Sequence, residues 1–551
     1  MRVAEAIGRA LAAHGVRQVF GLVGSGNFHV TNALVAAGAR FVATTHEAGA
    51  ATMADAYARV SGEVGVVSVH QGPGVTNALT GVTEATKSRT PLVVLAPEVT
   101  SPRSNFFLDL PGLASAVGAD FHRVRADCPA ADVVAAFSRA ASGHTVVLGL
   151  PLDVQVAEAS TVDFDPESAP WARLEADPAV EATNVDALVD TIVAARRPVF
   201  IAGRGATRPA GPARAALVQL ADRCGALLAV SAAAKGLFAG DPWYLDVSGG
   251  FASPLAAELI SGSDLVVAWG STLNMWTTRH GRIIGPSATV AQVDHDLAAL
   301  GVNRPADVGV HGDVTTVASV VDAALASQRW QGDGWRTPAL EKRIAAEVRW
   351  RDVPYSDDGG DGRIDPRTLS IALDDLLPFE RTVAVDSGNF LGYPSMFLSV
   401  PDAQGFCFTQ AFQSVGLGLA TAIGAALARP DRLAVAGLGD GGFLMSVGDL
   451  TTAVRLGLPL LVVVYDDAAF GAEVHHFGPD GHPLETVTFP DTDLAAIARG
   501  FGCDGVVARS VSDLSAVSDW LAGPQDRPFV VDAKVSAARG SWWLEEAFRG
   551  H

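Results

Sequence analysis

The sequence is poor in lysine, in cysteine and in positive charge. Lysine supplies only four of the 551 residues, so an enzyme that forms a Schiff base with its substrate would have few candidates. The four cysteines lie far apart without a CxxC pair, which argues against a zinc or thioredoxin-type motif and favours reduced thiols. The 40 basic residues are outnumbered by 60 acidic ones, and the net charge of −20 argues against nucleic acid or an anionic membrane as a partner.

Long hydrophobic runs are also missing. The longest apolar stretch, Val415–Ala428, is too short to cross a bilayer and is interrupted by glycine. The N-terminal segment carries charges at Arg2, Glu5 and Arg9 and lacks the apolar core of a signal peptide. These absences predict a cytoplasmic protein that does not enter the membrane.

What the sequence does contain is enough apolar residues for a large interior. Hydrophobic residues make up 49% of the chain, and 551 residues are too many for a single core. Two stretches, 163–184 and 328–365, are rich in Pro, Gly, Asp or Glu and are typical of linkers. They predict three domains, over residues 1–165, 185–330 and 360–551.

Short β-branched runs alternate with Ala- and Leu-rich stretches of helical pattern throughout the chain. The runs Leu433–Leu438 and Leu460–Tyr465 are continuously apolar, as strands covered on both faces of a parallel sheet are. The alternation predicts an α/β chain with three doubly wound parallel sheets. The first and third segments look like two similar units on either side of a different middle one.

The strongest chemical signal lies between Leu433 and Phe477. One predicted strand ends at Gly439-Asp440-Gly441-Gly442, and the next ends at Asp466-Asp467, which puts Asp440 and Asp467 27 residues apart. In a βαβ unit the carboxyl ends of neighbouring strands meet at a ligand crevice. Carboxylate and carbonyl oxygens suit Mg²⁺, and glycines let backbone N–H groups approach a diphosphate. A lone GDG is an ordinary turn, but the paired strand ends predict a magnesium–diphosphate site.

A further carboxylate follows a strand in the first segment. Glu47 comes after the run Phe41–Thr44 and directly before the helical pattern Ala48–Val60. The helix dipole alone favours a Glu at this position, so the position by itself specifies no function.

Together these segments resemble the thiamine diphosphate-dependent enzymes, and in particular the acetolactate (acetohydroxyacid) synthase group. The resemblance rests on the GDGG motif with its acidic pair, on the THEAGAATMADAYAR helix, on Gly72-Pro73-Gly74-Val75-Thr76-Asn77 and on Gly416–Leu427. It implies thiamine diphosphate and Mg²⁺ as cofactors, with a pyrimidine-binding domain first, a central domain next and a diphosphate-binding domain last. The usual Asn-Asn pair of the family is Asp466-Asp467 here.

The resemblance also implies roles for single residues. The Asp440 and Asp467 side chains and the Ala469 carbonyl would bind Mg²⁺, and Glu47 would activate the cofactor through its aminopyrimidine ring. Further residues would contact the cofactor: Ser387, Gly388, Asn389, Gln413, Val415, Gly439, Gly441, Gly442, Phe470 and Gly471.

The substrate pocket departs from the synthase pattern. His70-Gln71 stands where synthases have Ser-Gly, and pyruvate decarboxylases have a His-His pair there. Glu473 lies six residues after Asp467, where those decarboxylases carry a catalytic Glu. We expect His70, Gln71 and Glu473 to handle protons. The alternative for Glu473 is a solvated helix residue.

The middle segment leaves FAD as an open alternative. In synthases this domain holds FAD around stretches that resemble Lys235-Gly236, Asp241–Leu245 and Gln292-Val293-Asp294. The stretch Ser271–Thr277 differs from the family, and Trp276 stands where an Arg would hold a keto-acid carboxylate.

The resemblance implies that a 2-keto acid is decarboxylated and that its acyl carbanion is transferred to a carbonyl acceptor. It also implies a homodimer or homotetramer whose active sites are shared between subunits. His70 and Glu473 keep a second interpretation open, a 2-keto acid decarboxylase or an aldehyde lyase. Asp466 and Trp276 keep a third open, a non-catalytic paralogue.

Overall fold

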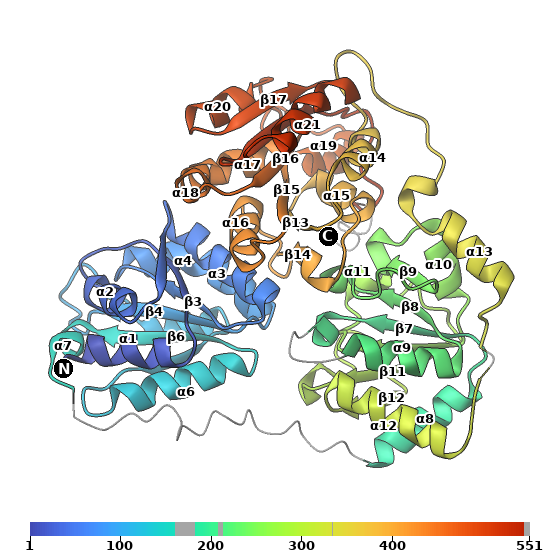
Figure 1. The fold of residues 1–551 in the computed structure, drawn as a ribbon, viewed down its shortest axis with the longest axis horizontal. Coiled ribbons are helices and arrows are strands. Elements are labelled where there is room, and N and C mark those ends of the chain that lie inside the picture. The colour runs from blue at the N-terminus through green and yellow to red at the C-terminus, as the bar shows by residue number, and fades with distance from the viewer. Residues whose placement is uncertain (160–181, 208–212, 333, 545–551) are drawn as a thin grey trace.

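The computed structural model describes residues 1–159, 182–207, 213–332 and 334–544. Within these ranges the chain forms three six-stranded sheets, whose named strands all pair in parallel, with helices around them (Figure 1). This confirms the predicted three doubly wound parallel sheets. The predicted linker 163–184 lies outside the described residues except at its end, whereas 328–365 contains helix α13 (Pro338–Glu347), whose Ile344 is buried in the core of the central domain.

The N-terminal sheet has the strand order β2-β1-β3-β4-β6-β5. Its strands are β1 (Gln18–Gly21), β2 (Arg40–Ala43), β3 (Gly65–Ser68), β4 (Leu92–Glu98), β5 (Asp120–Arg123) and β6 (Thr145–Pro151). Its helices are α1 (Val3–Ala13), α2 (Phe28–Ala36), α3 (Glu47–Ser61), α4 (Pro73–Lys87), α5 (Leu110–Ala116), α6 (Pro129–Ala141) and α7 (Leu152–Val156). Every residue of β4 and β6 is buried, which is why their sequences do not alternate between apolar and polar.

The central sheet has a different order, β12-β11-β10-β7-β8-β9. Its strands are β7 (Pro198–Ala202), β8 (Leu227–Val230), β9 (Tyr244–Val247), β10 (Leu265–Trp269), β11 (Thr289–Asp294) and β12 (Val308–His311). Its helices, besides α13, are α8 (Ala182–Ala194), α9 (Ala213–Cys224), α10 (Pro254–Ser261), α11 (Met275–Thr278) and α12 (Val314–Ser327). The strand order reverses between β7 and β10, and a crevice opens at such a point.

The C-terminal sheet repeats the order of the N-terminal one, as β14-β13-β15-β16-β18-β17. Its strands are β13 (Arg381–Val385), β14 (Phe406–Phe408), β15 (Leu433–Gly439), β16 (Leu460–Asp466), β17 (Asp504–Ala508) and β18 (Phe529–Lys534). Its helices are α14 (Pro366–Leu376), α15 (Gly392–Phe397), α16 (Gly418–Ala428), α17 (Asp440–Ser446), α18 (Leu450–Leu456), α19 (Gly471–Phe477), α20 (Leu494–Gly500) and α21 (Ser515–Ala522). The similarity expected between the first and third segments is therefore one of topology.

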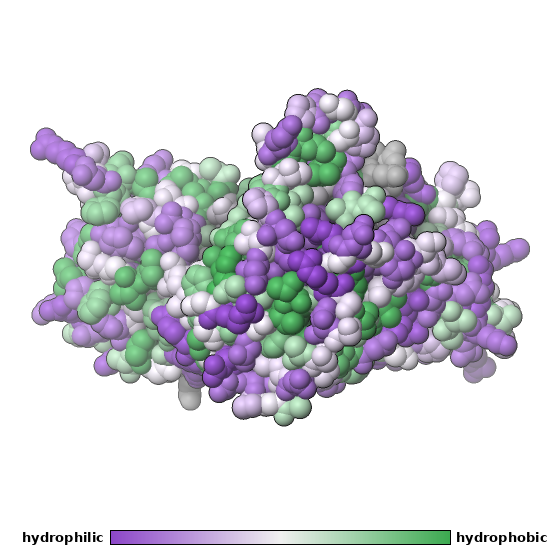
Figure 2. Space-filling model, turned by 90° about the horizontal axis from the view of Figure 1, so that it is seen from above, coloured by the Kyte–Doolittle hydropathy of each residue, from purple (hydrophilic) through white to green (hydrophobic). Residues whose placement is uncertain are grey.

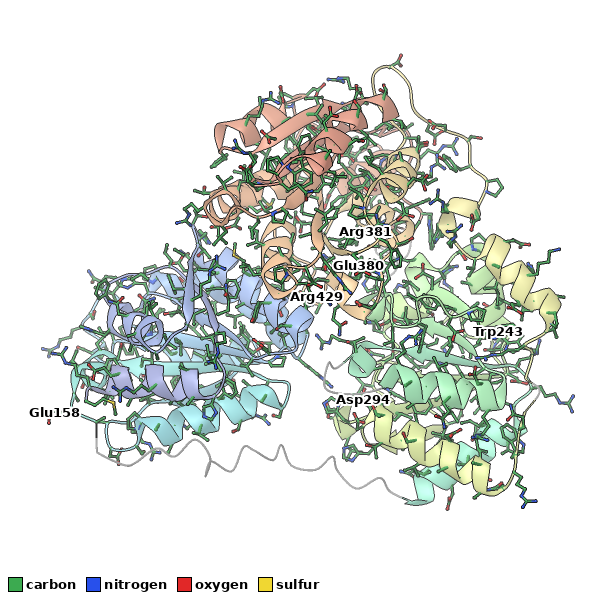
Figure 3. All side chains as sticks on the ribbon, in the orientation of Figure 1. Glu158, Trp243, Asp294, Glu380, Arg381 and Arg429 are labelled. Carbon is green, nitrogen blue, oxygen red and sulfur yellow. The ribbon has the colours of Figure 1, made fainter. Side chains whose placement is uncertain are left out.

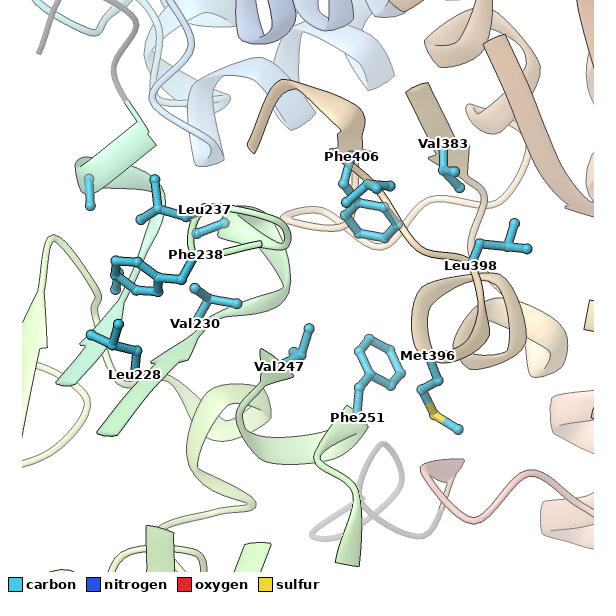
Figure 4. Packing of buried hydrophobic residues seen from close by; sticks show 14 of the residues in the cluster. Leu228, Val230, Leu237, Phe238, Val247, Phe251, Val383, Met396, Leu398 and Phe406 are labelled. Carbon is cyan, nitrogen blue, oxygen red and sulfur yellow. The ribbon is translucent and has the colours of Figure 1, made fainter. Parts of the chain in front are cut away.

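The C-terminal domain shares a hydrophobic core with each of its neighbours. Helix α16 packs on α3 of the N-terminal domain, and Gly424 allows this, because a Cβ there would overlap the backbone carbonyl of Met53. On the other side, Phe251 of the central domain belongs to the same buried cluster as Met396 and Phe406 of the C-terminal domain (Figure 4). The three domains are therefore held in one arrangement by buried apolar contacts.

A buried ion-pair network also joins the N-terminal and C-terminal domains. Arg59 of α3 pairs with Asp55 and Glu84 at 2.8 Å each and donates a hydrogen bond to the carbonyl of Phe408. Glu84 in turn accepts the backbone N–H groups of Ala411 and Phe412. Removing one partner from a buried network of this kind costs about 3–5 kcal/mol, so the network fixes how the two domains meet.

The surface mixes hydrophilic residues with apolar patches, as the face drawn in Figure 2 shows. Phe28, Phe106, Phe412 and Met445 are among the exposed large apolar side chains. In the part of the chain that the structure describes, every helix is too short or too polar to reach across a bilayer.

Candidate active site

Asp440 and Asp467 lie at the same edge of the C-terminal sheet. Asp440 begins α17 directly after β15, and Asp467 directly follows β16. The two strands remain paired as far as Gly439 and Tyr465, so the two carboxylates leave adjacent strand ends. This is the carboxyl edge of a parallel sheet, where open α/β folds bind their ligands.

Asp440 is buried and Asp467 is half-buried, and the charge of Asp467 disfavours ionisation of Asp440. Burial, together with the charges of Asp467 and Asp466, raises the pKa of Asp440 to about 8. Burial also raises the pKa of Asp467 to about 6, although Asn389 Nδ2 donates a hydrogen bond of 3.2 Å to its Oδ2. Such a pair of acids gains strongly from a divalent cation placed between them.

The Ala469 carbonyl is the third metal ligand that the resemblance implies, and Ala469 lines the same cavity as the acid pair. The Phe470 N–H donates to the Val487 carbonyl and the Phe489 N–H donates to the Ala468 carbonyl, a pairing that does not use the Ala469 carbonyl. No three His, Cys, Asp or Glu side chains of the described residues are grouped as metal ligands. An ion here would therefore be held by two carboxylates, one carbonyl and non-protein oxygens. That set fits Mg²⁺, which keeps waters and binds phosphate oxygens.

Glycines flank the acid pair, so parts of the backbone there carry no side chains. A Cβ on Gly471 would overlap Oδ2 of Asp467, and a Cβ on Gly442 would overlap Oδ2 of Asp386. Both positions therefore need glycine if the neighbouring carboxylates are to keep their places. An anionic ligand can approach the N–H groups of such a segment closely.

Asp386, at the end of β13, supports this edge; the resemblance places it with Ser387–Asn389 in the loop that contacts the diphosphate, but the sequence assigned it no role of its own. Its Oδ1 accepts the N–H groups of Ser387 and Leu417, and both its oxygens accept the N–H of Gly416. Burial raises its pKa to about 6. A signal was available, because Asp386 is an acid at a strand end and directly precedes the Ser387–Asn389 loop.

A cavity of about 1170 Å³ opens onto this edge of the sheet. It is lined by every C-terminal residue that the sequence placed at the site: Ser387, Gly388, Asn389, Gln413, Val415, Gly439, Asp440, Gly441, Gly442, Asp467, Ala469, Phe470, Gly471 and Glu473. Val415 presents an exposed side chain to it, and Gln413 reaches it on a backbone with a φ of 61°.

The residues expected from the first segment form a second group, at the edge of the N-terminal sheet. His46 caps α3 by accepting the Ala48 N–H on its Nδ1, which places Glu47 in the first turn. Glu47 is buried, and its Oε2 accepts a hydrogen bond of 3.1 Å from Asn77 Nδ2.

His70 and Gln71 belong to the same group. A Cβ on Gly74 would lie 3.1 Å from Cβ of His70 and 3.2 Å from Oε1 of Glu47, so both side chains border one glycine. The His70 ring meets Phe106 edge to face, at 5.7 Å between ring centres. Gln71 is buried, and its Oε1 has no hydrogen-bond partner within the described residues.

The two groups are separate within one chain. Of the residues that the structure describes, Glu47, His70 and Gln71 are not among those lining the cavity beside Asp440. The two groups lie on matching edges of two sheets with the same strand order.

Three family models cover these domains. The N-terminal TPP binding domain of thiamine pyrophosphate enzymes matches residues 1–114, their central domain matches 185–321, and their C-terminal TPP binding domain matches 386–533. A relative from Alcaligenes xylosoxydans xylosoxydans, a sulfoacetaldehyde acetyltransferase, is 30% identical over 93% of this chain and 89% of its own. The chain belongs to the thiamine pyrophosphate enzyme family.

Two further similarities extend over nearly the whole of this thiamine pyrophosphate enzyme. The acetolactate synthase large subunit of Parasynechococcus marenigrum (strain WH8102) is 30% identical over 98% of this chain and 88% of its own. A thiamine diphosphate-dependent 4-hydroxybenzoylformate decarboxylase from Rhodococcus jostii RHA1 has the same fold, with a TM-score of 0.79 and 20% identity over 97% of this chain and 99% of its own. The first relationship supports an acetolactate synthase-like transferase or lyase, and the second supports the fold.

The central domain of this thiamine pyrophosphate enzyme forms another wall of the cavity. Gly203 and Ser271 line it just after β7 and β10, and Trp276 lines it from α11. Asp294, at the end of β11, lines it too and lies on the side of the central domain that faces the N-terminal domain (Figure 3). The reversal point of the central sheet thus opens into the same cavity as the acid pair.

Most of the stretches compared with a FAD site turn away from this cavity. Lys235 donates a hydrogen bond of 2.7 Å to the Ser395 carbonyl of the C-terminal domain. Gln292 donates to the carbonyls of Ser271 and Ala299 inside the central domain. Asp294 alone of these stretches lines the cavity among the described residues. Lys235 and Gln292 are therefore engaged in contacts within the protein and not with this cavity.

Proposed function

We propose that this thiamine pyrophosphate enzyme uses Mg²⁺ to decarboxylate a 2-keto acid and to transfer the acyl unit to a carbonyl acceptor. The observation that carries the proposal is the pair of residue groups on matching sheet edges. We take these groups as two half-sites: the N-terminal half-site contains Glu47, and the C-terminal half-site contains Asp440 and Asp467. Thiamine diphosphate, when bound, stabilises the carbanion on which such C–C chemistry depends.

The C-terminal half-site would hold the cofactor. Asp440, Asp467 and the Ala469 carbonyl would bind Mg²⁺, and the backbone at Gly441 and Gly442, which carries no side chains, would take the diphosphate. The exposed side chain of Val415 would support the rings, and the backbone near Gln413 would offer a hydrogen-bonding group to the pyrimidine. The Ser387–Asn389 loop closes the same side, held in place by Asp386.

The N-terminal half-site would move protons. Asn77 orients Glu47 by donating to its Oε2, which leaves Oε1 to exchange a proton with the pyrimidine ring. His70 borders the same glycine as Glu47 and delivers a proton to a substrate oxygen, and Gln71 orients that oxygen. Glu473 approaches from the cavity wall of the other half-site.

The test is a product analysis. Purified protein is incubated with Mg²⁺, thiamine diphosphate and pyruvate, and both CO₂ and acetolactate are measured. Formation of both supports the transfer reaction. The absence of both products, together with no cofactor-dependent rise in the melting temperature, would overturn the proposal.

A second candidate function is a 2-keto acid decarboxylase or aldehyde lyase. His70 and Glu473 favour it, because a decarboxylase must protonate its carbanion. His70 belongs to the N-terminal half-site and Glu473 to the C-terminal one, so each half-site has a residue that can donate a proton. CO₂ with acetaldehyde and no acetolactate would identify this reaction in the same assay.

We further propose a homodimer or homotetramer in which each active site takes one half from each subunit. The separation of the half-sites supports this, as do the exposed apolar side chains of Phe412 and Met445 near the cavity wall. Mixing inactive E47Q chains with inactive D440N chains then restores about a quarter of the activity, because half of the dimers are mixed and each of these has one intact site. A mixture that remains inactive after subunit exchange would contradict shared sites. The cytoplasmic location stays a prediction.

A further inference from the structure

Lys534 is a buried lysine with no part in the mechanism proposed above. It is the last residue of β18, and only 1% of its side chain is exposed. Its Nζ donates hydrogen bonds to Oδ2 of Asp466 at 2.5 Å and to the Thr492 carbonyl at 2.6 Å, and it lies 2.8 Å from Oδ1 of Asp491. Asp532, fully buried, lies 3.1 Å away. All three protons of the ammonium therefore have acceptors.

Asp466 connects this lysine to the acid pair. It is paired with Lys534 across the sheet and directly precedes Asp467 in the chain. While Oδ2 accepts from Lys534, Oδ1 accepts the N–H of Ala468 at 2.9 Å. Ala468 has a φ of 58°, a left-handed conformation that is uncommon for a residue with a side chain. One carboxylate thus holds both the lysine and the turn that leads to the Ala469 carbonyl.

The charge at position 466 needs a counter-ion. An amide at this position could accept the Ala468 N–H equally well, but the carboxylate adds a negative charge that acts on Asp440. Asp466 itself is buried, so water does not screen this charge. The ammonium of Lys534 is the cation in direct contact with it, and the Arg363 guanidinium reaches only the Asp466 carbonyl.

We propose that Lys534 is a positioning residue for the metal-binding turn, because its ammonium neutralises Asp466 and holds the carboxylate that shapes Asp467–Ala469. The inference rests on the proposed role of Asp467 and Ala469 in binding Mg²⁺. It explains how this chain accommodates an acid where the family pattern has an amide.

Three variants and a control test the pairing. K534M removes the ammonium and keeps an apolar side chain, D466N removes the acid and keeps an acceptor for the Ala468 N–H, and the third variant combines both changes. K342M is the control, because Lys342 is an exposed lysine. Mg²⁺ is titrated calorimetrically into each apoprotein at saturating thiamine diphosphate, and urea unfolding of each apoprotein is measured separately.

We expect K534M to weaken Mg²⁺ binding by about 10- to 100-fold, the usual range for a residue that supports a metal ligand. D466N should weaken Mg²⁺ binding less than K534M does, because the Lys534 ammonium keeps the Thr492 carbonyl, Asp491 and Asp532 as partners. The double variant should bind Mg²⁺ more tightly than K534M and unfold at higher urea, since it no longer buries an unpaired charge at 466. K342M should match the wild type.

Two results would overturn the assignment: K534M binding Mg²⁺ like the wild type, or a double variant no better than K534M in binding and in unfolding. If K534M does not fold, a folded double variant supports the pairing, and failure of both to fold overturns it. Wild-type protein that binds no thiamine diphosphate with Mg²⁺ would refute the proposed function, and the unfolding series would still decide whether Lys534 serves Asp466.

Discussion

The N-terminal and C-terminal domains have the same strand order but carry different chemistry at the same edge. At the N-terminal edge, Glu47 lies in the first turn of α3 and accepts a hydrogen bond from Asn77. At the C-terminal edge, Asp440 and Asp467 leave adjacent strand ends, and the charge of Asp467 contributes to the raised pKa of Asp440. The comparison teaches that the fold supplies the position, whereas under the proposed function the spacing of the acids decides between moving a proton and holding a cation.

The largest effect on kcat should come from removing the carboxylate of Glu47 at the N-terminal edge. E47Q keeps an oxygen to accept the Asn77 hydrogen bond but cannot exchange a proton, so we expect a loss of about 10²- to 10⁴-fold in kcat. Hydrogen–deuterium exchange at C2 of the bound cofactor, followed by NMR, should slow in parallel.

E341Q serves as the control for this variant, because Glu341 is an exposed helix residue. If E47Q exchanges the C2 proton at the wild-type rate, the contrast between a proton-moving edge and a cation-binding edge does not hold.

The next effect concerns the crowded acids of the C-terminal edge. D440N keeps the shape of the side chain but removes one of two charges that repel each other, so the apoprotein should become more stable. The same variant should bind Mg²⁺ and thiamine diphosphate at least about 10-fold more weakly, because it loses a charged ligand. Thermal unfolding with and without both ligands measures the two opposite shifts.

D519N is the matched control, since Asp519 is exposed and should show neither shift. A D440N apoprotein that is less stable than the wild type would mean that the two acids do not repel each other.

A moderate effect on kcat is expected from adding a methyl group beside Gln71 at the N-terminal edge while Glu47 is left unchanged. A Cβ on Gly26 would overlap Oε1 of Gln71, so G26A must displace the Gln71 side chain. We expect kcat to fall about 10-fold, as for other small misplacements, while cofactor binding stays unchanged.

The control is G500A, because the space around Gly500 is open within the described structure. If G26A weakens cofactor affinity and leaves kcat intact, Gln71 acts in binding and its assignment to proton handling is wrong.

The last prediction concerns stability and its pH dependence, and it tests the contact between the two domains. Asp449 accepts a hydrogen bond from Thr45 near the start of α3, and burial raises its pKa from 3.8 to about 7. A folded-state pKa above the unfolded value means that stability falls as the pH rises from about 4 to about 7. D449N should therefore equal the wild type near pH 4 and be more stable above pH 7, by up to about 4 kcal/mol for this rise in pKa.

Urea unfolding at pH 5 and pH 8 measures this difference, with D519N again as the control. A stability gap that does not change with pH would show that Asp449 is not protonated on folding.

Much of the fold could be predicted from the sequence because its signals are local. The continuous apolar runs of β15 and β16 identified parallel strands, and the acids directly after them identified the edge where Asp440 and Asp467 meet. The placement of Glu47 could also be predicted, because the end of one strand and the start of the next helix are adjacent in the chain.

Features that depend on contacts distant in sequence could not be predicted. Nothing near Asp466 indicates that Lys534, 68 residues later, would be its counter-ion. Lys235 looked like a cofactor residue because of its neighbours in sequence, yet its ammonium binds the Ser395 carbonyl of another domain. The stretch 328–365 had the composition of a linker, and burial of Ile344 is what makes part of it a packed helix.

The close approach of α16 to α3 has a consequence for protein engineering. Because Gly424 lies against the backbone of Met53, the surfaces of the two domains fit only as a matched pair. Chimeras that take the C-terminal domain from a relative should thus be chosen by the residue at the position of Gly424 and not by overall identity, because any side chain there would overlap the Met53 carbonyl.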